Sequence, residues 1–163
     1  SSHVVLPGVG AFGDSMKNIC ARGMDVAIRE VIAQGIPFLG ICVGLQALFT
    51  IGEEKGTHQG LNIFQGRVPV FTEGLVPQIG WNQVHFLRED PLLADITNHS
   101  YFYFVHSYYA LPEDRSIIIA ETDYHIDYAS IVGRDRVWGV QFHPEKSQEM
   151  GLRILRNFSR IGS

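Results

Sequence analysis

One of the two cysteines of the chain, Cys42, stands between two glycines in the pattern G-I-C-V-G of residues 40–44. An apolar run precedes this pattern and a helical one follows it, which is the strand–turn–helix arrangement of a nucleophile elbow. Gly40 and Gly44 would tolerate the close backbone contacts of such a turn. Because helix N-termini favour anions, we expect the thiol pKa of Cys42 to fall there. The alternative is a small core cysteine beside a helix-packing glycine.

A thiolate that performs acyl transfer needs a base that also protonates the leaving amine. His143 follows the strand-like run at residues 137–142 and precedes Pro144 and Glu145. Proline keeps this segment extended, so side chains 143 and 145 should point to the same side. Glu145 would then accept a proton from one imidazole nitrogen and leave the other nitrogen for Cys42. A surface His-Pro-Glu turn is the alternative.

Acyl transfer also requires donors at the place where the carbonyl oxygen becomes negative. The sequence Pro-Gly-Val-Gly at residues 7–10 ends a predicted strand that could neighbour the elbow strand. Its glycines leave the amides of Val9 and Gly10 unshielded. This segment is therefore a candidate oxyanion hole, although Pro-Gly is also a common turn.

The elements that must position these groups alternate between strand and helix in the first third of the chain. A buried strand at residues 3–6 and a strand at residues 36–41 are separated by two helices, one capped by Asp14 and one over residues 24–35 that ends at Gly35. Met16, Ile19 and Cys20 share one face of the first helix, so Cys20 is expected in the core. A helical run follows at residues 43–49. This order predicts an α/β fold with a parallel sheet.

The centre of the chain is strand-like, rich in β-branched and aromatic residues. The expected strands lie in residues 60–71, 76–87, 101–111 and 116–122, followed by a hairpin around Gly133–Arg136. A final helix begins after Ser147 and presents a stripe of Met150, Ile154, Leu155 and Phe158. We find no internal repeat and no linker, and we interpret residues 1–163 as a single domain.

Composition restricts the classes of partner. The chain has 163 residues, of which 45% are hydrophobic and 18% charged, which is typical of a globular domain. A formal net charge of −4 without a cluster of Lys and Arg argues against a nucleic-acid partner. Two cysteines suit a reducing compartment, and the absence of a long apolar run argues against a membrane span. We therefore expect a cytoplasmic protein.

Taken together, the segments LPGVGAFG, GICVGLQ and GVQFHPEKS resemble the class I (triad-type) glutamine amidotransferases. The resemblance runs from residue 4 to about residue 160. Gly44-Leu45-Gln46 is the form typical of the glutaminase subunits of imidazole glycerol phosphate synthase, whereas other members usually have Gly-His-Gln. The segments QIGWNQV at residues 78–84 and YFYFVHSYY at residues 101–109 also resemble those subunits. The fold implied is flavodoxin-like, with a mixed central sheet flanked by helices and the site at the carboxyl ends of the strands.

The resemblance also implies roles for individual residues. Cys42 would be the nucleophile, His143 the general acid/base and Glu145 its orienting partner. Backbone groups of Gly8, Val9, Gly10 and Val43 would hold the oxyanion. Gln46 and the segment His106, Ser107 and Tyr108 would bind the amino-acid end of glutamine, although His106 could equally be a core histidine. The positions that would face a partner are Trp81, Asn82, Tyr103 and Lys146, with core packing as the alternative for the two aromatic residues and a solvated surface charge for Lys146.

The reaction implied is hydrolysis of L-glutamine to glutamate and ammonia, without a metal or another cofactor. The ammonia would pass to a (β/α)8 cyclase subunit in a heterodimer that makes imidazole glycerol phosphate for histidine biosynthesis. The five remaining histidines show no metal-ligand spacing: His3, His58, His85, His99 and His125. The alternatives are the glutaminase of another synthase and a partner-binding module without catalytic activity. Family members begin with a further strand and helix, and we expect their absence to leave an exposed apolar sheet edge.

Overall fold

The fold is α/β, with a mixed central sheet flanked by helices. It is seen in a computed structural model that describes residues 2–8 and 10–162. The sheet has six strands in the order β1-β2-β12-β11-β10-β7. Strands β1, β2 and β12 are parallel to one another, and the remaining neighbours are antiparallel. The predicted fold class is therefore confirmed. The strands are β1 (Val4–Leu6), β2 (Phe38–Ile41), β7 (His85–Phe86), β10 (Ile118–Asp123), β11 (Asp127–Arg134) and β12 (Val137–Val140).

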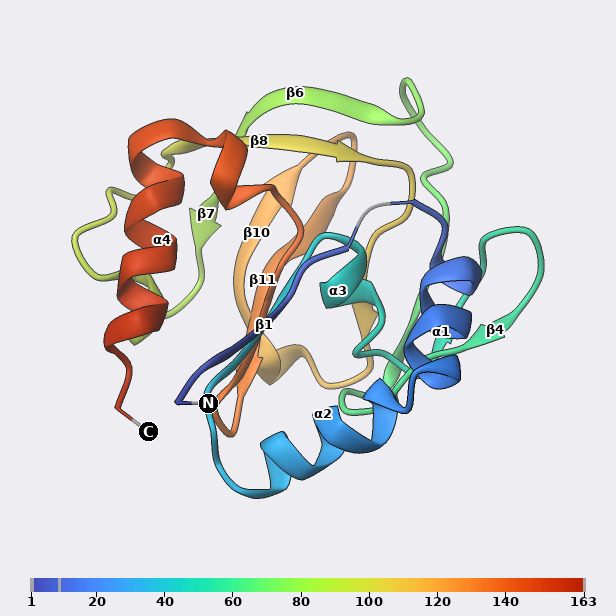
Figure 1. Ribbon diagram of the computed structural model, residues 1–163. Helices are drawn as coiled ribbons and strands as arrows, with labels where there is room; N and C mark the ends of the chain where they lie inside the picture. Colours follow the sequence, from blue (N-terminus) through green and yellow to red (C-terminus); the bar gives the residue numbers. More distant parts are fainter. Residues whose placement is uncertain (1, 9, 163) are drawn as a thin grey trace.

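Both faces of this sheet are buried, because successive residues of each strand pack into different clusters. In β2, Phe38 packs with α1 and α2 on one side, whereas Leu39 packs with α4 on the other. Figure 1 shows α4 on the left of the sheet and α1 and α2 on the lower right. The helices are α1 (Phe12–Ala21), α2 (Met24–Ala33), α3 (Val43–Gln46) and α4 (Gln148–Arg160), with short 3-10 turns η1 (Pro91–Leu93), η2 (Arg115–Ile117) and η3 (Pro144–Lys146).

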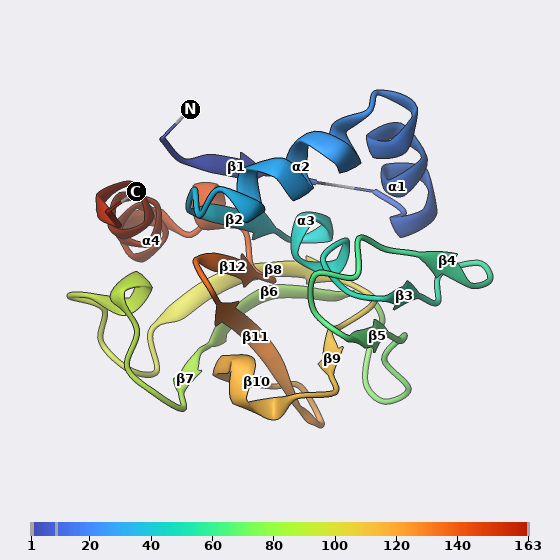
Figure 2. The ribbon, with the colours of Figure 1, turned by 90° about the horizontal axis from the view of Figure 1, so that it is seen from below.

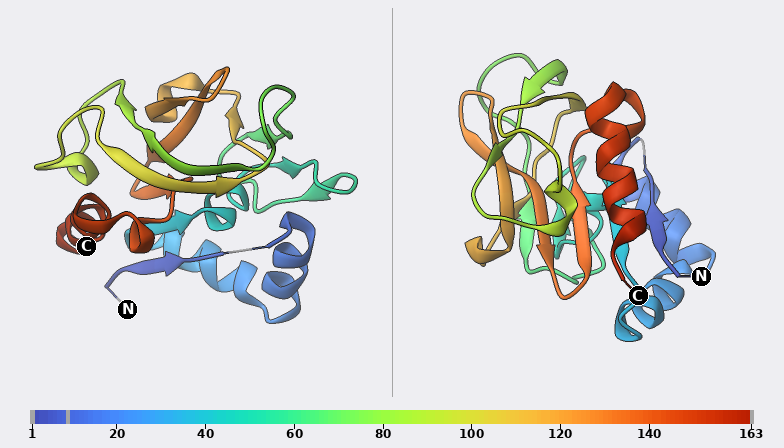
Figure 3. Two further views of the ribbon diagram at one scale, coloured as in Figure 1. Left: turned by 90° about the horizontal axis from the view of Figure 1, so that it is seen from above. Right: turned by 90° about the vertical axis from the view of Figure 1, so that its left-hand side faces the viewer.

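Two smaller sheets complete the molecule. One has the order β4-β3-β5-β9 and comprises β3 (Ile51–Gly52), β4 (His58–Gln59), β5 (Gly66–Val68) and β9 (Leu111–Pro112). Figure 2 shows it beside α1 and α3. The other pairs β6 (Gln78–Gln83) with β8 (Tyr101–His106) in antiparallel register. Strands β6 and β8 cross the top of the molecule in Figure 1 and lie in front when it is seen from above (Figure 3).

Strand β1 forms an edge of the main sheet, and its Val5 is 43% exposed. At the start of β1, the His3 imidazole Nε2 bonds to the carbonyl of Ile161 at 2.7 Å, which joins this edge to the end of α4. None of the helices in the described ranges is long and apolar enough to cross a membrane.

Two details of the first helix were predicted wrongly. Cys20 is exposed, because the buried face of α1 is formed by Phe12, Met16 and Ile19. Asp14 lies inside the first turn and is not the N-cap. The helix begins earlier because the buried Phe12 is included in it and the Phe12 N–H donates to the Glu54 carboxylate at 3.3 Å. A partner remote in the sequence therefore replaces the local cap.

The other boundaries follow the predictions with differences in length. The hairpin of β11 and β12 turns through Asp135 and Arg136, both with positive φ, as in the turns that match strand twist. The helix predicted over residues 43–49 stops at Gln46. Helix α4 begins after Ser147 as predicted, but the Ser147 hydroxyl donates to the His143 carbonyl at 2.6 Å and does not cap the helix.

Candidate active site

The turn between β2 and α3 has the geometry expected of a nucleophile elbow. Cys42 adopts φ 56° and ψ −111°, a conformation that L-residues rarely adopt. A Cβ atom at Gly40 would lie 2.5 Å from the carbonyl oxygen of Gly44, and one at Gly44 would lie 2.0 Å from the carbonyl oxygen of Leu6. The two glycines are therefore required by backbone contacts, one within the turn and one against β1.

The sulfur of Cys42 has polar neighbours despite its burial. Gln141 Nε2 donates to Sγ at 3.6 Å, and the carbonyl of Val105 lies 4.0 Å from Sγ. Burial raises the thiol pKa of Cys42 to about 11, and the nearby Glu145 carboxylate adds to the increase. Hydrogen bonds from the Val43 N–H and from Gln141 oppose it only in part. The predicted fall of this pKa was therefore wrong, because desolvation outweighs the helix N-terminus in a helix of only one turn.

His143 lies three residues beyond the end of β12, in a position fixed by backbone hydrogen bonds. Its N–H donates to the Tyr103 carbonyl at 3.0 Å, and its carbonyl accepts bonds from the Ser147 hydroxyl and the Lys146 N–H. The imidazole Nδ1 lies 3.3 Å from Glu145 Oε2, so these side chains point to the same side as predicted. The His143 side chain is buried and that of Glu145 is half exposed, at 4% and 49%. The Glu145 carboxylate is therefore the hydrogen-bond partner of Nδ1 of His143.

Cys42 and His143 meet at one cavity of about 310 Å³. No hydrogen bond joins their side chains in the described part of the chain, and the sulfur bonds instead to the groups given above. Six further residues assigned to oxyanion or substrate binding line the same cavity: Gly10, Val43, Gln46, His106, Ser107 and Tyr108. Gly8 packs against the elbow, since a Cβ atom there would lie 3.1 Å from the Gly44 nitrogen. Val9 lies outside the described residues.

Gln46 and His106 both use polar atoms to hold Tyr108. Gln46 Nε2 and His106 Nδ1 lie 3.0 and 2.7 Å from the Tyr108 carbonyl oxygen. The other His106 nitrogen contacts Gln78 and the Tyr128 hydroxyl. Burial lowers the pKa of His106 to about 4, so its ring is neutral near pH 7. His106 thus has the bonds of a satisfied core histidine while it borders the cavity.

The residues assigned to a partner surface do not all lie together. Trp81 and Tyr103 are cross-strand neighbours on the outer face of β6 and β8, with ring centroids 5.9 Å apart. Asn82 points to the opposite face, where its amide donates to the Asp123 carbonyl at 2.9 Å. Lys146 borders the cavity of Cys42 and His143. Of the four residues, only Trp81 and Tyr103 therefore lie side by side on the outer face of this strand pair.

One residue of the site, Gln141, was missed at the level of sequence. It is fully buried and contacts both Cys42 Sγ and Gln46. The available signal was a polar side chain within the apolar run of residues 137–142, two positions before His143. A buried polar side chain requires a partner, and that requirement indicates a site or a network.

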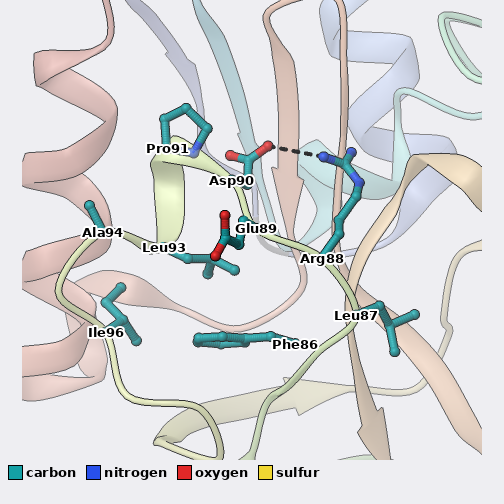
Figure 4. A pocket seen from close by; sticks show the side chains of 9 residues that line it. All are labelled: Phe86, Leu87, Arg88, Glu89, Asp90, Pro91, Leu93, Ala94 and Ile96. Carbon is teal, nitrogen blue, oxygen red and sulfur yellow. Dashed lines mark hydrogen bonds and ion pairs between the residues drawn. The ribbon is translucent and has the colours of Figure 1, made fainter.

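A larger cavity, of about 750 Å³, lies away from these groups between β7 and η1 (Figure 4). Its most buried carboxylate, Asp90, already accepts hydrogen bonds from Trp138 Nε1 and the Leu92 N–H, both at 2.9 Å, and pairs with Arg88 at 3.4 Å. These bonds attach the loop to the sheet. Cys42 and His143 line the smaller cavity, and Glu145 lies 3.3 Å from His143 Nδ1, so cavity size does not locate the chemistry.

Comparisons with known proteins agree with the geometry. Residues 1–161 match the family model for glutamine amidotransferase class-I. The imidazole glycerol phosphate synthase subunit HisH of Desulfitobacterium hafniense (strain Y51) is 46% identical over 158 residues, which cover 96% of this chain and 75% of that protein. The same-named subunit of Syntrophotalea carbinolica is 49% identical over 166 residues, covering 97% and 81%.

A solved structure supports the fold at much lower identity. The structure of PurLQS from Thermotoga maritima matches with a TM-score of 0.74 and 15% identity, covering 97% of this chain and 78% of that one. At this identity the likeness concerns the fold alone. With the family model matched over nearly the whole chain and HisH subunits at 46% and 49% identity, the chain belongs to the class-I glutamine amidotransferases and, within them, to the HisH family.

Proposed function

We propose that this chain hydrolyses L-glutamine to glutamate and ammonia and supplies the ammonia to a (β/α)8 cyclase subunit that makes imidazole glycerol phosphate in histidine biosynthesis. The observation that carries the proposal is the cavity shared by Cys42 and His143, together with the Glu145 carboxylate that lies 3.3 Å from Nδ1 of the same imidazole. The subunit name of the relatives at 46% and 49% identity supports the choice of synthase.

The residues divide the chemistry as follows. His143 removes the thiol proton of Cys42, and Sγ attacks the side-chain amide carbon of glutamine. His143 then transfers the proton to the departing nitrogen, so ammonia leaves and a γ-glutamyl thioester remains. Water activated by His143 cleaves the thioester, releases glutamate and restores the thiol. Because the resting thiol pKa is about 11, almost no thiolate exists at neutral pH without this base.

Backbone donors are proposed to stabilise the oxyanion of both steps. One proposed donor is the N–H of Val43, the first residue of α3 and the residue directly after the nucleophile. The other is the N–H of Gly10, which borders the same cavity. Gly10 has φ +95°, a conformation that favours glycine. We assign the amino-acid end of glutamine to the side of the cavity formed by Gln46, Ser107 and Tyr108.

The proposal is tested with purified chain and the cyclase subunit, by measuring glutamate release and glutamine-dependent imidazole glycerol phosphate formation. We expect Cys42→Ala to lose glutamine-dependent turnover, because Cys42 carries the only thiol among the described residues that line the cavity. We expect it also to lose the covalent mass increase given by an electrophilic glutamine analogue. Cys20→Ser is the matched control, since its thiol is exposed on α1.

The two alternative functions predict different results in this assay. A partner-binding module would dock the cyclase without glutamate release or labelling. A glutaminase of another synthase would release glutamate but would not support imidazole glycerol phosphate formation by the cyclase. Either result in a folded sample would contradict the proposal.

We assign the cyclase-facing surface to the outer face of β6 and β8. Trp81 is 46% exposed there beside Tyr103, and Ile79 and Tyr101 extend the apolar area. Exposed aromatic residues of this kind are enriched at interfaces. The same strands contact the site, since the Tyr103 carbonyl accepts the His143 N–H. A partner docked here would lie next to the catalytic groups.

Trp81→Ala is expected to weaken cyclase binding about tenfold or more, because buried Trp side chains dominate interface energies. Titration calorimetry with the cyclase measures the effect. Val26→Ala is the control: Val26 is equally apolar and 57% exposed, but it lies on α2, away from β6 in Figure 1. Equal affinities for the two variants would refute the assignment of this surface.

We also infer a cytoplasmic location. It is supported by the free thiols of Cys20 and Cys42, which a reducing compartment maintains.

A further inference from the structure

Gln141 directly follows the last residue of β12 and is fully buried, so its amide cannot be satisfied by bulk water. Its two polar atoms have different partners. Nε2 lies 3.6 Å from Cys42 Sγ, and Oε1 lies 3.1 Å from Gln46 Nε2. The question is whether the donor or the acceptor end of the amide faces the sulfur, because the two ends have opposite effects on a thiol.

The backbone of Tyr108 decides the orientation. Gln46 has one amide atom 3.0 Å from the Tyr108 carbonyl oxygen. A carbonyl oxygen only accepts hydrogen bonds, so that atom must be the NH₂ nitrogen of Gln46. The same nitrogen faces Gln141, which must present its oxygen there. The NH₂ group of Gln141 is thereby directed at Cys42 Sγ, and a flipped amide would leave two donors facing each other.

A donor at sulfur favours the thiolate, whereas an acceptor would favour the thiol. We propose that Gln141 is a positioning residue for the nucleophile, held by Gln46 so that its NH₂ group orients and stabilises the Cys42 sulfur as an anion. This inference rests on the proposed function of Cys42. It adds a second role for Gln46, whose NH₂ group is occupied by Tyr108 and Gln141 and therefore serves the elbow in addition to the substrate.

The arrangement compensates in part for the buried position of the nucleophile. Desolvation and the Glu145 carboxylate both disfavour a negative charge on the sulfur. The Val43 N–H, the Gln141 amide and the positive charge of Lys146 favour it. Gln141 is the neutral side-chain donor among these groups. Since it is fully buried, its contribution is not screened by solvent or salt.

The test is the pH dependence of Cys42 alkylation by iodoacetamide in the full chain, on a Cys20→Ser background so that a single thiol reports. Gln141→Met keeps the volume and removes the donor. We expect alkylation near pH 8 to slow about tenfold and the rate profile to move to higher pH, as for loss of a hydrogen bond to a charged group. A purely structural role would lower the melting temperature without moving the profile of the folded protein.

Gln46→Met supplies the second variant, because it removes the group that orients Gln141. We expect its profile to move in the same direction, and the double variant to move no further than Gln141→Met alone. If Gln141→Met does not fold, the profile of Gln46→Met decides. A folded variant whose profile superimposes on that of the parent would overturn the proposal.

Iodoacetamide requires neither glutamine nor the cyclase, so the readout is separate from glutaminase activity. A moved profile in a chain without glutaminase activity would support the role of Gln141 at the sulfur and count against the proposed function. If the parent chain has glutaminase activity but the alkylation profile of Gln141→Met does not move, the proposed function is supported and the role of Gln141 at the sulfur is refuted.

Discussion

His143→Gln should reduce kcat/KM for glutamine hydrolysis in the cyclase complex by about 10³-fold, the middle of the range for general acid–base catalysis. The thiol pKa of about 11 explains why the loss should be large, since Cys42 remains protonated at neutral pH without a base. The residual activity should rise about tenfold per pH unit toward that pKa, because only direct ionisation then supplies the thiolate. Steady-state kinetics from pH about 7 to 9 measures both effects.

Glu145→Gln is the comparison variant for this experiment. It removes the carboxylate that holds His143 Nδ1, but it also removes a negative charge that raises the thiol pKa. The side chain is half exposed, so solvent already screens its charge. We therefore expect a smaller loss than for His143→Gln. Activity of His143→Gln within tenfold of the parent would exclude His143 as the catalytic base.

Gly44→Ala should destabilise the fold by about 3 kcal/mol or more, at the upper end of overpacking effects. The added Cβ would lie 2.0 Å from the Leu6 carbonyl oxygen, and the atoms to be displaced belong to the backbone of β1. No side-chain rotation can relieve that overlap. Urea unfolding followed by circular dichroism measures the change in free energy of unfolding.

The matched control is Gly162→Ala, where no heavy atom lies within 4 Å of the new Cβ. Its free energy of unfolding should stay within about 0.5 kcal/mol of the parent. A Gly44→Ala variant as stable as this control would mean that β1 and the elbow do not pack as described. If β1 shifts without global unfolding, glutaminase activity should still fall, because Gly8 and Gly10 lie within four residues of the end of β1.

The elbow was predictable because its evidence is local. A short apolar run, two glycines around a cysteine and a following helical pattern all lie within residues 36–49. The pair His143 and Glu145 was equally local, since an extended backbone places alternate side chains on one side. The same alternation would have placed Trp81 and Asn82 on opposite faces of β6, as the structure shows. Periodicity thus carried more information about this surface than the motif did.

The sequence-based predictions were wrong or incomplete where contacts with segments distant in the chain determine the structure. Cys20 is one position beyond the buried stripe of α1, and this depends on how the helix is rotated against β2 and α3. Helix α1 starts at Phe12 because Glu54, far along the chain, accepts its N–H. The role of Gln141 required the contacts of three other segments, which bring Cys42, Gln46 and the Tyr108 carbonyl to it.

The sequence by itself determined the kinds of chemical group in this protein and the local turns that carry them: a thiol on a glycine-flanked bend, an imidazole two residues from a carboxylate, and an alternation of strands and helices. Only the tertiary structure decided that the thiol and the imidazole share one cavity and that the thiol pKa rises. The physical reason is that backbone conformation depends on neighbouring residues, whereas desolvation and electrostatic energy are sums over every group packed around an atom.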